Sequence, residues 1–335
     1  MSALAESAHL QAAIVTAVLS FALTGVATWY SSRRGLLDHP GERSSHVRPT
    51  PRGGGAGLMS ALMVVSWSAA VAVLPAAWSQ LLLPLAVLLA LLGWVDDHRP
   101  LSPRLRFFVQ FAVTSVLLAF ASHSGWLQGV PVVLLAGLFI LWMTNLYNFM
   151  DGSNGMAATQ GVFAGLVLSW LFSLSGDAPF ALASLLVAAA CTGFLPWNLG
   201  HARVFLGDVG SLPLGFIFGV LLVYGGGSGG IDLPVALMVM MVFLADSSLT
   251  LLLRVLRREQ WYNPHNKHLY QRMIAGGWTH GHVLLLYLAL NLALVLPGIV
   301  VAVRYPALAW PLVVAMTLIF GTGWYLSIRK IGVLA

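Results

Sequence analysis

Hydrophobic residues in this chain are gathered into eleven long stretches, separated by short segments that hold most of the charged residues. A helix needs about 20 consecutive apolar residues to cross the hydrocarbon core of a membrane, and most of the stretches approach that length. The pattern predicts an all-α, polytopic integral membrane protein with one transmembrane domain over residues 1–335. The predicted spans are 8–30, 54–75, 79–95, 107–123, 130–147, 156–175, 179–197, 211–225, 231–252, 282–303 and 307–328.

The cations indicate how these spans are oriented. Arg33 and Arg34 follow the first span, and cytoplasmic loops carry an excess of Lys and Arg. With that end inside, sixteen of the seventeen Lys and Arg residues fall in loops on one side, and only Arg304 falls on the other. We therefore expect the N-terminus outside the cell, the C-terminus in the cytoplasm, and the longer, chemically richer loops on the cytoplasmic face.

Composition supports this class and excludes others. Hydrophobic residues make up 59% of the chain and charged residues only 8%, against about a quarter charged in a soluble domain. The formal net charge of +6 comes without a basic helix or a recognition motif, so we expect no nucleic-acid partner. The cations suit anionic lipid headgroups and phosphorylated substrates instead.

Two adjacent carboxylates, Asp96 and Asp97, follow the third predicted span. Adjacent carboxylates repel each other unless a cation or a proton relieves the repulsion. Hard cations such as Mg²⁺ take oxygen ligands, so the pair suits a metal or phosphate site. The alternative is an ordinary polar flank, with Arg99, Arg104 and Arg106 as partners.

Three polar residues, Asn145, Asn148 and Asp151, step by three along the end of the fifth span. Their directions drift over roughly 120° of a helix, so all three can line one inward face. Amides this close to the hydrocarbon are costly unless they face protein or a water-filled cavity. The pattern favours a binding site, and a structural polar seam is the alternative.

The segment Phe205–Ser211 precedes the eighth span and contains Gly207-Asp208-Val-Gly-Ser211. We expect Ser211 to cap that helix, and the glycines to let a ligand approach the backbone. A helix N-terminus favours phosphate. Asp208 would repel an anion there, so it is better suited to hold a metal. A simple helix start is the alternative.

Three further features lie in loops or within a span. His265 and His268 can share a face and hydrogen-bond a phosphate; zinc is disfavoured because no Cys or obvious third ligand accompanies them. Solvated loop histidines are the alternative. The segment Arg48-Pro-Thr-Pro-Arg52 precedes the run Gly53–Gly55, and a glycine run after a basic residue suits either a phosphate nest or a flexible loop. Asp246 lies within the ninth span, where an acid is a functional candidate by default; the alternatives are a pair with a buried Arg or a protonated carboxyl group.

Taken in order, these segments resemble the polyprenyl-phosphate N-acetylhexosamine-1-phosphate transferases, the family of MraY and WecA. The resemblance covers most of the chain and rests on five motifs in the family's order, namely Asp38–His46 with Pro49–Gly55, Asp96-Asp97, Asn145–Ala157, Asn198 with Phe205–Ser211, and His265–His268. It implies that a polyprenyl phosphate attacks the β-phosphorus of a UDP-N-acetylhexosamine in a Mg²⁺-dependent reaction, in which Mn²⁺ can substitute, and that UMP leaves. It also implies a bacterial inner-membrane location, an active site on the cytoplasmic face, and a homodimer.

The resemblance further implies roles by position. Asp208 matches the family's metal-binding Asp, with Asp97 as a second metal residue, and Asp96 is expected to engage or deprotonate the lipid phosphate. These three are the expected catalytic residues. The expected substrate-binding residues are Asn148, Asp151 and Asn198 for the nucleotide sugar, Phe205 for stacking on uracil, and Arg48, His265 and His268 for clamping phosphates.

Departures from the family's pattern indicate the branch. The muramyl-peptide branch has a denser histidine cluster, reduced here to His265-x-x-His268. The loops 148–156 and 257–277 are nearer to enzymes that initiate O-antigen or other surface polysaccharides, which suggests N-acetylglucosamine or a 6-deoxy N-acetylhexosamine as the sugar. A phospho-N-acetylmuramoyl-pentapeptide transferase of peptidoglycan synthesis ranks second. A lipid or solute transporter, from another class, should carry charges near mid-membrane, where only Asp246 lies.

Overall fold

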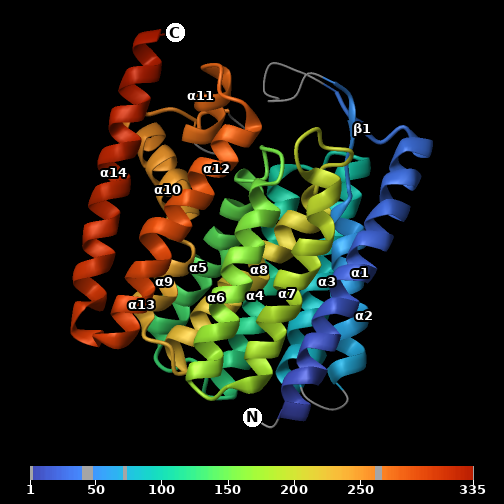
Figure 1. Ribbon diagram of the computed structural model, residues 1–335, viewed down its shortest axis with the longest axis vertical. Helices are drawn as coiled ribbons and strands as arrows, with labels where there is room; N and C mark the ends of the chain where they lie inside the picture. The colour runs from blue at the N-terminus through green and yellow to red at the C-terminus, as the bar shows by residue number, and fades with distance from the viewer. Residues whose placement is uncertain (1–2, 40–47, 71–73, 261–265, 335) are drawn as a thin grey trace.

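Long helices run side by side and make up most of the described chain (Figure 1). The computed structural model describes residues 3–39, 48–70, 74–260 and 266–334. The all-α, polytopic class is confirmed. The elements are α1 (Ala3–Arg34), β1 (Leu37–Asp38), β2 (Thr50–Pro51), α2 (Gly55–Ala70), η1 (Trp78–Leu82), α3 (Leu83–His98), α4 (Pro103–His123), α5 (Val130–Phe149), α6 (Met156–Leu174), α7 (Ala178–Asn198), α8 (Asp208–Gly227), α9 (Leu233–Val239), α10 (Met241–Leu256), α11 (Leu269–Ala275), α12 (His280–Leu290), η2 (Asn291–Val295), α13 (Leu296–Arg304), η3 (Pro306–Leu308) and α14 (Ala309–Leu334).

Ten of the eleven predicted spans have counterparts long enough to cross a membrane. Nine helical segments in the described residues meet the length and hydropathy that a span needs, and the pair α9 and α10 makes up to ten. The other predicted span, 54–75, corresponds to α2, which is described over 16 residues. The predicted span over 231–252 corresponds to this pair, and the chain bends by 79° between α9 and α10. The apolar run there contains no Gly or Pro at the break to signal it.

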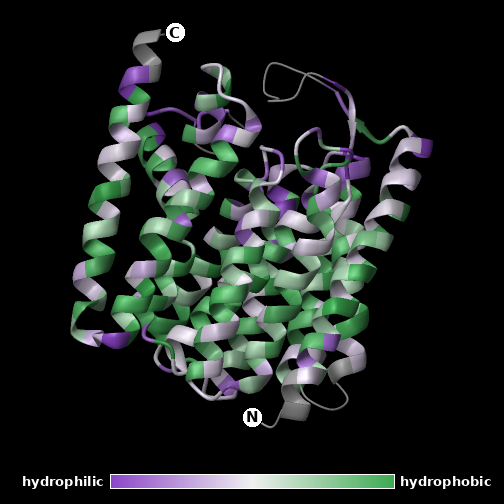
Figure 2. Ribbon diagram, viewed as in Figure 1, coloured by the Kyte–Doolittle hydropathy of each residue, from purple (hydrophilic) through white to green (hydrophobic). Residues whose placement is uncertain are grey.

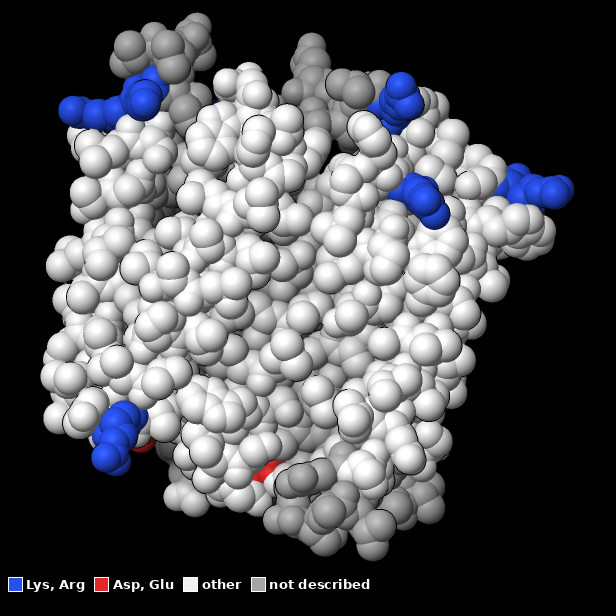
Figure 3. Space-filling view, in the orientation of Figure 1, with Lys and Arg blue, Asp and Glu red and all other residues white. Residues whose placement is uncertain are grey.

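Polar residues gather at the two ends of the helical bundle, and apolar residues fill the space between them (Figure 2). The N- and C-termini lie at opposite ends, as an odd number of spans requires (Figure 1). One face of the molecule carries almost no charged side chain between the two ends (Figure 3). Exposed apolar side chains such as Phe108 and Leu135, each 67% exposed, suit contact with lipid.

Helix α8 lies at the centre of the bundle. It is the most buried span among the described helices, with 83% of its most apolar stretch inside the protein. Two of its glycines lack the side chain that would prevent neighbouring helices from packing closely. A Cβ at Gly215 would lie 2.6 Å from the carbonyl oxygen of Met143 in α5, and one at Gly210 would lie 2.8 Å from Gly55 Cα at the start of α2. The start of α8 is therefore fixed by close backbone packing.

A short strand pair fastens the first loop to the start of α8. Strand β1 pairs antiparallel with β2, and the chain then runs along the segment before α8. The Phe205 amide donates to the Pro51 carbonyl at 2.8 Å, and the Gly54 amide donates back to the Phe205 carbonyl at 2.9 Å. These bonds place Arg52 and the following glycines beside the ends of α3 and α8.

Candidate active site

Three carboxylates meet where α3 ends and α8 begins. Asp96 and Asp97 lie in the last turn of α3, and Asp208 is the first residue of α8. The two helices approach closely because Gly93 has no side chain: a Cβ there would lie 2.2 Å from the carbonyl carbon and oxygen of Asp208. The predicted catalytic residues Asp96, Asp97 and Asp208 are thus brought together.

Asp97 holds the start of α8. Its carboxylate accepts the backbone N–H groups of Asp208 and Val209, each at 3.3 Å, so it caps the helix from a neighbouring element. Gly207 has φ +73°, and a Cβ there would lie 2.6 Å from Asp97 Oδ2. The prediction that Ser211 caps α8 is wrong, because Ser211 lies inside the first turn and its hydroxyl donates to the Gly207 carbonyl at 3.0 Å.

A guanidinium bridges the other two carboxylates. Arg106 Nη1 lies 3.1 Å from Asp96 Oδ2 and 3.0 Å from Asp208 Oδ2. The second oxygen of Asp96 accepts the Leu101 amide at 2.7 Å, which fixes the carboxylate at the start of the α3–α4 loop. A single cation therefore relieves the repulsion between Asp96 and Asp208.

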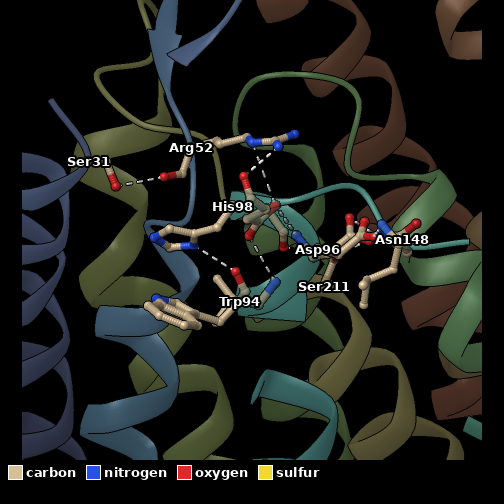
Figure 4. A network of polar contacts seen from close by, with 12 residues as sticks. Ser31, Arg52, Trp94, Asp96, His98, Asn148 and Ser211 are labelled. Atoms are coloured by element: carbon tan, nitrogen blue, oxygen red, sulfur yellow. Dashed lines mark hydrogen bonds and ion pairs between the residues drawn. The ribbon is translucent and has the colours of Figure 1, made fainter. Parts of the chain in front are cut away.

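Asn148 completes the cluster from α5. Its side-chain amide donates to Asp208 Oδ1 and to the Ser211 hydroxyl, both at 2.8 Å (Figure 4). Asn145 is turned instead toward α4, where its amide donates to Gln110 at 2.7 Å. Asn148 therefore faces the carboxylates, whereas Asn145 joins α5 to α4.

Asp151 follows α5 in the loop beside this cluster. Desolvation raises the pKa of its carboxyl group well above the usual range, and the carboxylates of Asp208 and Asp97 raise it further. A hydrogen bond from the Gly207 backbone acts in the opposite direction. A cation or a hydrogen-bond donor on a bound ligand would stabilise the ionised form of Asp151.

Asn198 ties two loops together. Its side-chain oxygen Oδ1 accepts a hydrogen bond from the Gly155 backbone N–H at 2.6 Å, and its side-chain NH₂ group donates to the Val204 carbonyl at 2.8 Å. The side chain is 4% exposed. Its expected contact with a nucleotide sugar stays a prediction, and its present partners indicate that it also holds the loops that carry Asp151 and Phe205.

Replacing Asn198 by Ala is expected to lower the free energy of unfolding by about 2–3 kcal/mol, because it leaves a buried N–H and a buried carbonyl without their partner. Thermal unfolding in detergent measures the change. The matched control is Asn154→Ala, which removes a solvent-exposed bond from the side-chain amide to the Gly200 carbonyl. An equal loss in both variants would contradict the assigned role.

The structure shows no contact between the carboxylates and the other predicted binding residues that it describes. His268 is 3% exposed, and its ring centre lies 5.9 Å from that of Phe149. Phe205 is half-buried, and Arg48 is exposed on the loop that leads into β2. His265 lies outside the described residues. The binding roles expected for these four residues stay predictions.

Asp246 is the anchor of the segment that carries His268. This carboxylate accepts the Leu269 amide at 2.8 Å, the Tyr287 hydroxyl at 2.7 Å and the Trp324 indole N–H at 3.3 Å. It therefore joins α10 to the start of α11, to α12 and to α14. Asp246 is 3% exposed, and these bonds satisfy the buried carboxylate from within the protein.

Acidification is expected to destabilise the protein through His268. Burial lowers the pKa of His268 in the folded state below its usual value of about 6.5. The unfolded chain then binds more protons, so stability falls as pH drops through about 6.5 and is constant above it. Unfolding between pH 8 and pH 5 should show a weaker pH dependence in His268→Gln than in the exposed control His282→Gln. Equal slopes would contradict this assignment.

Comparison with known proteins identifies the family of this chain. Residues 79–226, which include α3, α5 and the start of α8, match the model of the glycosyl transferase family 4. A phospho-N-acetylmuramoyl-pentapeptide-transferase of Moorella thermoacetica is 32% identical over 237 residues, which cover 63% of this chain and 72% of the relative. The chain belongs to glycosyl transferase family 4.

Two further relatives of the transferase match more of its length. A decaprenyl-phosphate N-acetylglucosaminephosphotransferase of Mycobacterium tuberculosis is 29% identical, over 82% of this chain and 77% of the relative. A probable undecaprenyl-phosphate N-acetylglucosaminyl 1-phosphate transferase of Bacillus subtilis is 28% identical, over 82% and 80%. The resemblance seen in the sequence motifs is confirmed.

The magnesium site expected at the carboxylate cluster stays a prediction, and the side chains present can be compared with what Mg²⁺ requires. The oxygen ligands that the cluster offers are carboxylates, and the guanidinium of Arg106 lies between Asp96 and Asp208, so this position already accommodates a positive charge. No three His, Cys, Asp or Glu side chains within the described ranges lie close enough to form a metal cage. Mg²⁺ commonly keeps several waters and takes only one or two carboxylates beside substrate phosphates, so the residues fit.

Sequence reasoning missed two residues at this site of the transferase. Arg106 was expected at most as a partner in an ordinary polar flank, yet it bridges two of the three carboxylates. Arg52 lies 4.0 Å from Asp97 Oδ1 and donates to the Asp97 carbonyl. Both belong to the cations that set membrane orientation, so their sequence positions alone do not indicate a role at the site. The signal that identifies them is their closeness to Asp96 and Asp97 once the loops fold.

Proposed function

We propose that the transferase moves a sugar-1-phosphate from a UDP-N-acetylhexosamine to undecaprenyl phosphate and releases UMP. The observation that carries this is the cluster of Asp96, Asp97 and Asp208 at the polar end of an apolar bundle, with Arg106 bridging Asp96 and Asp208. A lipid acceptor held in the membrane and a water-soluble donor can meet at such a place. The names of the mycobacterial and Bacillus relatives support this reaction.

The reaction is a phosphoryl transfer. An oxygen of the lipid phosphate forms a bond to the β-phosphorus of the donor, while the bond from that phosphorus to the bridging oxygen breaks and this oxygen leaves with UMP. Asp208 and Asp97 would hold Mg²⁺, which neutralises charge on the diphosphate and on the departing UMP. A lipid phosphate is already largely ionised at neutral pH. Asp96 is therefore assigned mainly to positioning, through its hold on Arg106.

The polar residues around the carboxylates would bind the donor. Asn148 and Asp151 face the nucleotide sugar, and Asn198 shapes the loop beneath it. Phe205 stacks on uracil. The phosphates are clamped by Arg48, His265 and His268.

We place the carboxylate end of the bundle on the cytoplasmic face of a bacterial inner membrane. The alternation of cations supports this, because cytoplasmic loops carry an excess of Lys and Arg. UDP-sugar then reaches the carboxylates from the cytoplasm, and the short loops at the other end of the bundle contain few candidate site residues. A homodimer remains an expectation from the family alone.

The sugar is proposed to be N-acetylglucosamine or a 6-deoxy N-acetylhexosamine, at the start of O-antigen or another surface polysaccharide. The names of the mycobacterial and Bacillus relatives support N-acetylglucosamine. A phospho-N-acetylmuramoyl-pentapeptide transferase is the second candidate, favoured by the 32% identity to the Moorella protein.

Release of UMP tests the proposal. We expect purified protein to release UMP when given undecaprenyl phosphate, Mg²⁺ and one member of a panel of UDP-N-acetylhexosamines. The panel should include UDP-N-acetylmuramoyl-pentapeptide. EDTA should stop release, and Mg²⁺ or Mn²⁺ should restore it. Release only with the muramoyl donor would select the second candidate, and no release with any donor from folded protein would overturn the reaction.

A further inference from the structure

A cavity of about 300 Å³ lies between α1, α2 and α3, outside the cluster that holds Arg106 and Asn148. Trp94 and His98 line it, and they lie across Asp96 from Asn148 and Ser211 (Figure 4). Asp97 forms part of its inner wall. Among the residues that line this space, the proposed reaction assigns a role to Asp97 alone.

The lining changes in chemical character along the helices. Leu23 and Val26 of α1 and Ala56 of α2 make an apolar part. Trp29, Tyr30 and Trp94 follow as aromatic side chains, and Arg52 and His98 line the polar part. The Tyr30 hydroxyl lies 3.4 Å from His98 Nε2, so the aromatic and polar parts are joined. Aromatic residues with a polar tip are typical of the membrane–water boundary.

The cavity opens sideways, toward the membrane. The residues at its rim are exposed: Val26 by 59%, Trp29 by 61% and Trp94 by 42%. Ser60 of α2 is also exposed there. An apolar space with an exposed rim on a spanning helix faces lipid chains, so a lipid is the natural occupant.

Cations gather at the aromatic end of the cavity. The guanidinium of Arg33 lies 5.5 Å from the centre of the Trp29 ring, and that of Arg34 lies 5.8 Å from the centre of the Tyr30 ring. Arg52 lines the cavity itself. The nearby acid Asp97 is engaged with the start of α8 and with Arg52. The end of the cavity therefore presents positive charge to a ligand.

We propose that this cavity binds one membrane phospholipid with a negatively charged headgroup. Its phosphate lies among Arg33, Arg34 and Arg52, and an acyl chain enters the apolar part. The acceptor lipid is the competing occupant that the test must exclude, because Asp97 lines the cavity and also contacts the Asp208 amide. The proposal is independent of the reaction that the transferase catalyses.

Lipid counting by native mass spectrometry tests the site. The full chain in detergent is titrated with phosphatidylglycerol and, separately, with phosphatidylcholine. We expect one phosphatidylglycerol to bind at concentrations where phosphatidylcholine does not. The double variant Arg33→Gln/Arg34→Gln should bind about 30-fold more weakly, since each cation contributes about fivefold. Ser60→Phe fills the rim of the cavity and should remove this one lipid.

Two controls match these changes away from the cavity. Arg329→Gln removes a cation that also lies over an aromatic ring, 4.8 Å from the centre of Tyr325, and Thr317→Phe adds the same bulk to an exposed position of α14. Neither should alter binding. Thermal unfolding verifies that each variant folds. If Ser60→Phe fails to fold, the double Arg variant alone still tests the site.

Three results would overturn the proposal. Equal binding of the two phospholipids would show ordinary lipid packing. Unchanged binding in the double Arg variant, or in folded Ser60→Phe, would place the lipid elsewhere. Displacement of the bound phosphatidylglycerol by an equal amount of undecaprenyl phosphate would identify the acceptor as the occupant.

Discussion

Replacement of Asp208 by Asn should lower the rate of UMP release by about 100- to 1000-fold, the usual loss when a charge-stabilising group is removed from an active site. The carboxylate accepts hydrogen bonds from Asn148 at 2.8 Å and from Arg106 at 3.0 Å. An amide has the same shape but no charge, so it holds neither Mg²⁺ nor the guanidinium as well. The rate with saturating donor and lipid, measured over a range of Mg²⁺ concentrations, gives the effect.

The control for this experiment is Asp232→Asn. Asp232 is an exposed acid that precedes α9 and makes no side-chain capping bond there. Asp232 lies at the end of the bundle opposite to the carboxylate cluster, so Asp232→Asn should release UMP at the wild-type rate. Thermal unfolding of both variants separates chemistry from folding. If Asp208→Asn kept the full rate and an unchanged Mg²⁺ requirement, the metal would not lie at Asp208.

Much of the carboxylate cluster could be predicted because each member stands out against an apolar background. Burying a carboxylate or amide at the end of a membrane span costs free energy unless the group has partners. Asp96, Asp97, Asn148 and Asp208 could therefore each be identified from the sequence as candidate site residues. The alternation of cations then placed them all at the same end. That they meet within hydrogen-bonding distance required the structure, because it depends on the approach of α3 to α8 at Gly93.

Other features gave no such signal. Arg106 looks like one of many orientation-setting cations, and only its position between Asp96 and Asp208 distinguishes it. Asn198 resembles a ligand contact in sequence, while its two polar groups bond the backbones of Gly155 and Val204. The bend between α9 and α10 falls inside an unbroken apolar run. Tertiary packing decides all three, and a single sequence does not encode it locally.

Replacement of Gly93 by Ala is expected to abolish most activity without touching any charged group. The new methyl would lie 2.2 Å from backbone atoms of Asp208, which cannot move aside as a flexible side chain can. Helices α3 and α8 must therefore separate by more than 1 Å before an ordinary contact of at least 3.4 Å is restored. Overpacking of this kind costs about 1–3 kcal/mol of stability. A misplacement of about 1 Å at a catalytic group costs about 100-fold in rate.

The separation should first break the bonds from the Asp208 and Val209 amides to Asp97, each already 3.3 Å long. UMP release and thermal unfolding, measured on the same preparation, report the two losses. The matched control is Gly321→Ala in α14, where a Cβ would meet nothing within 4 Å. Replacing that helical glycine should leave the rate unchanged and stabilise the helix by about 0.5–1 kcal/mol. Full activity in folded Gly93→Ala would mean that the close approach of α3 to α8 does not position the carboxylates.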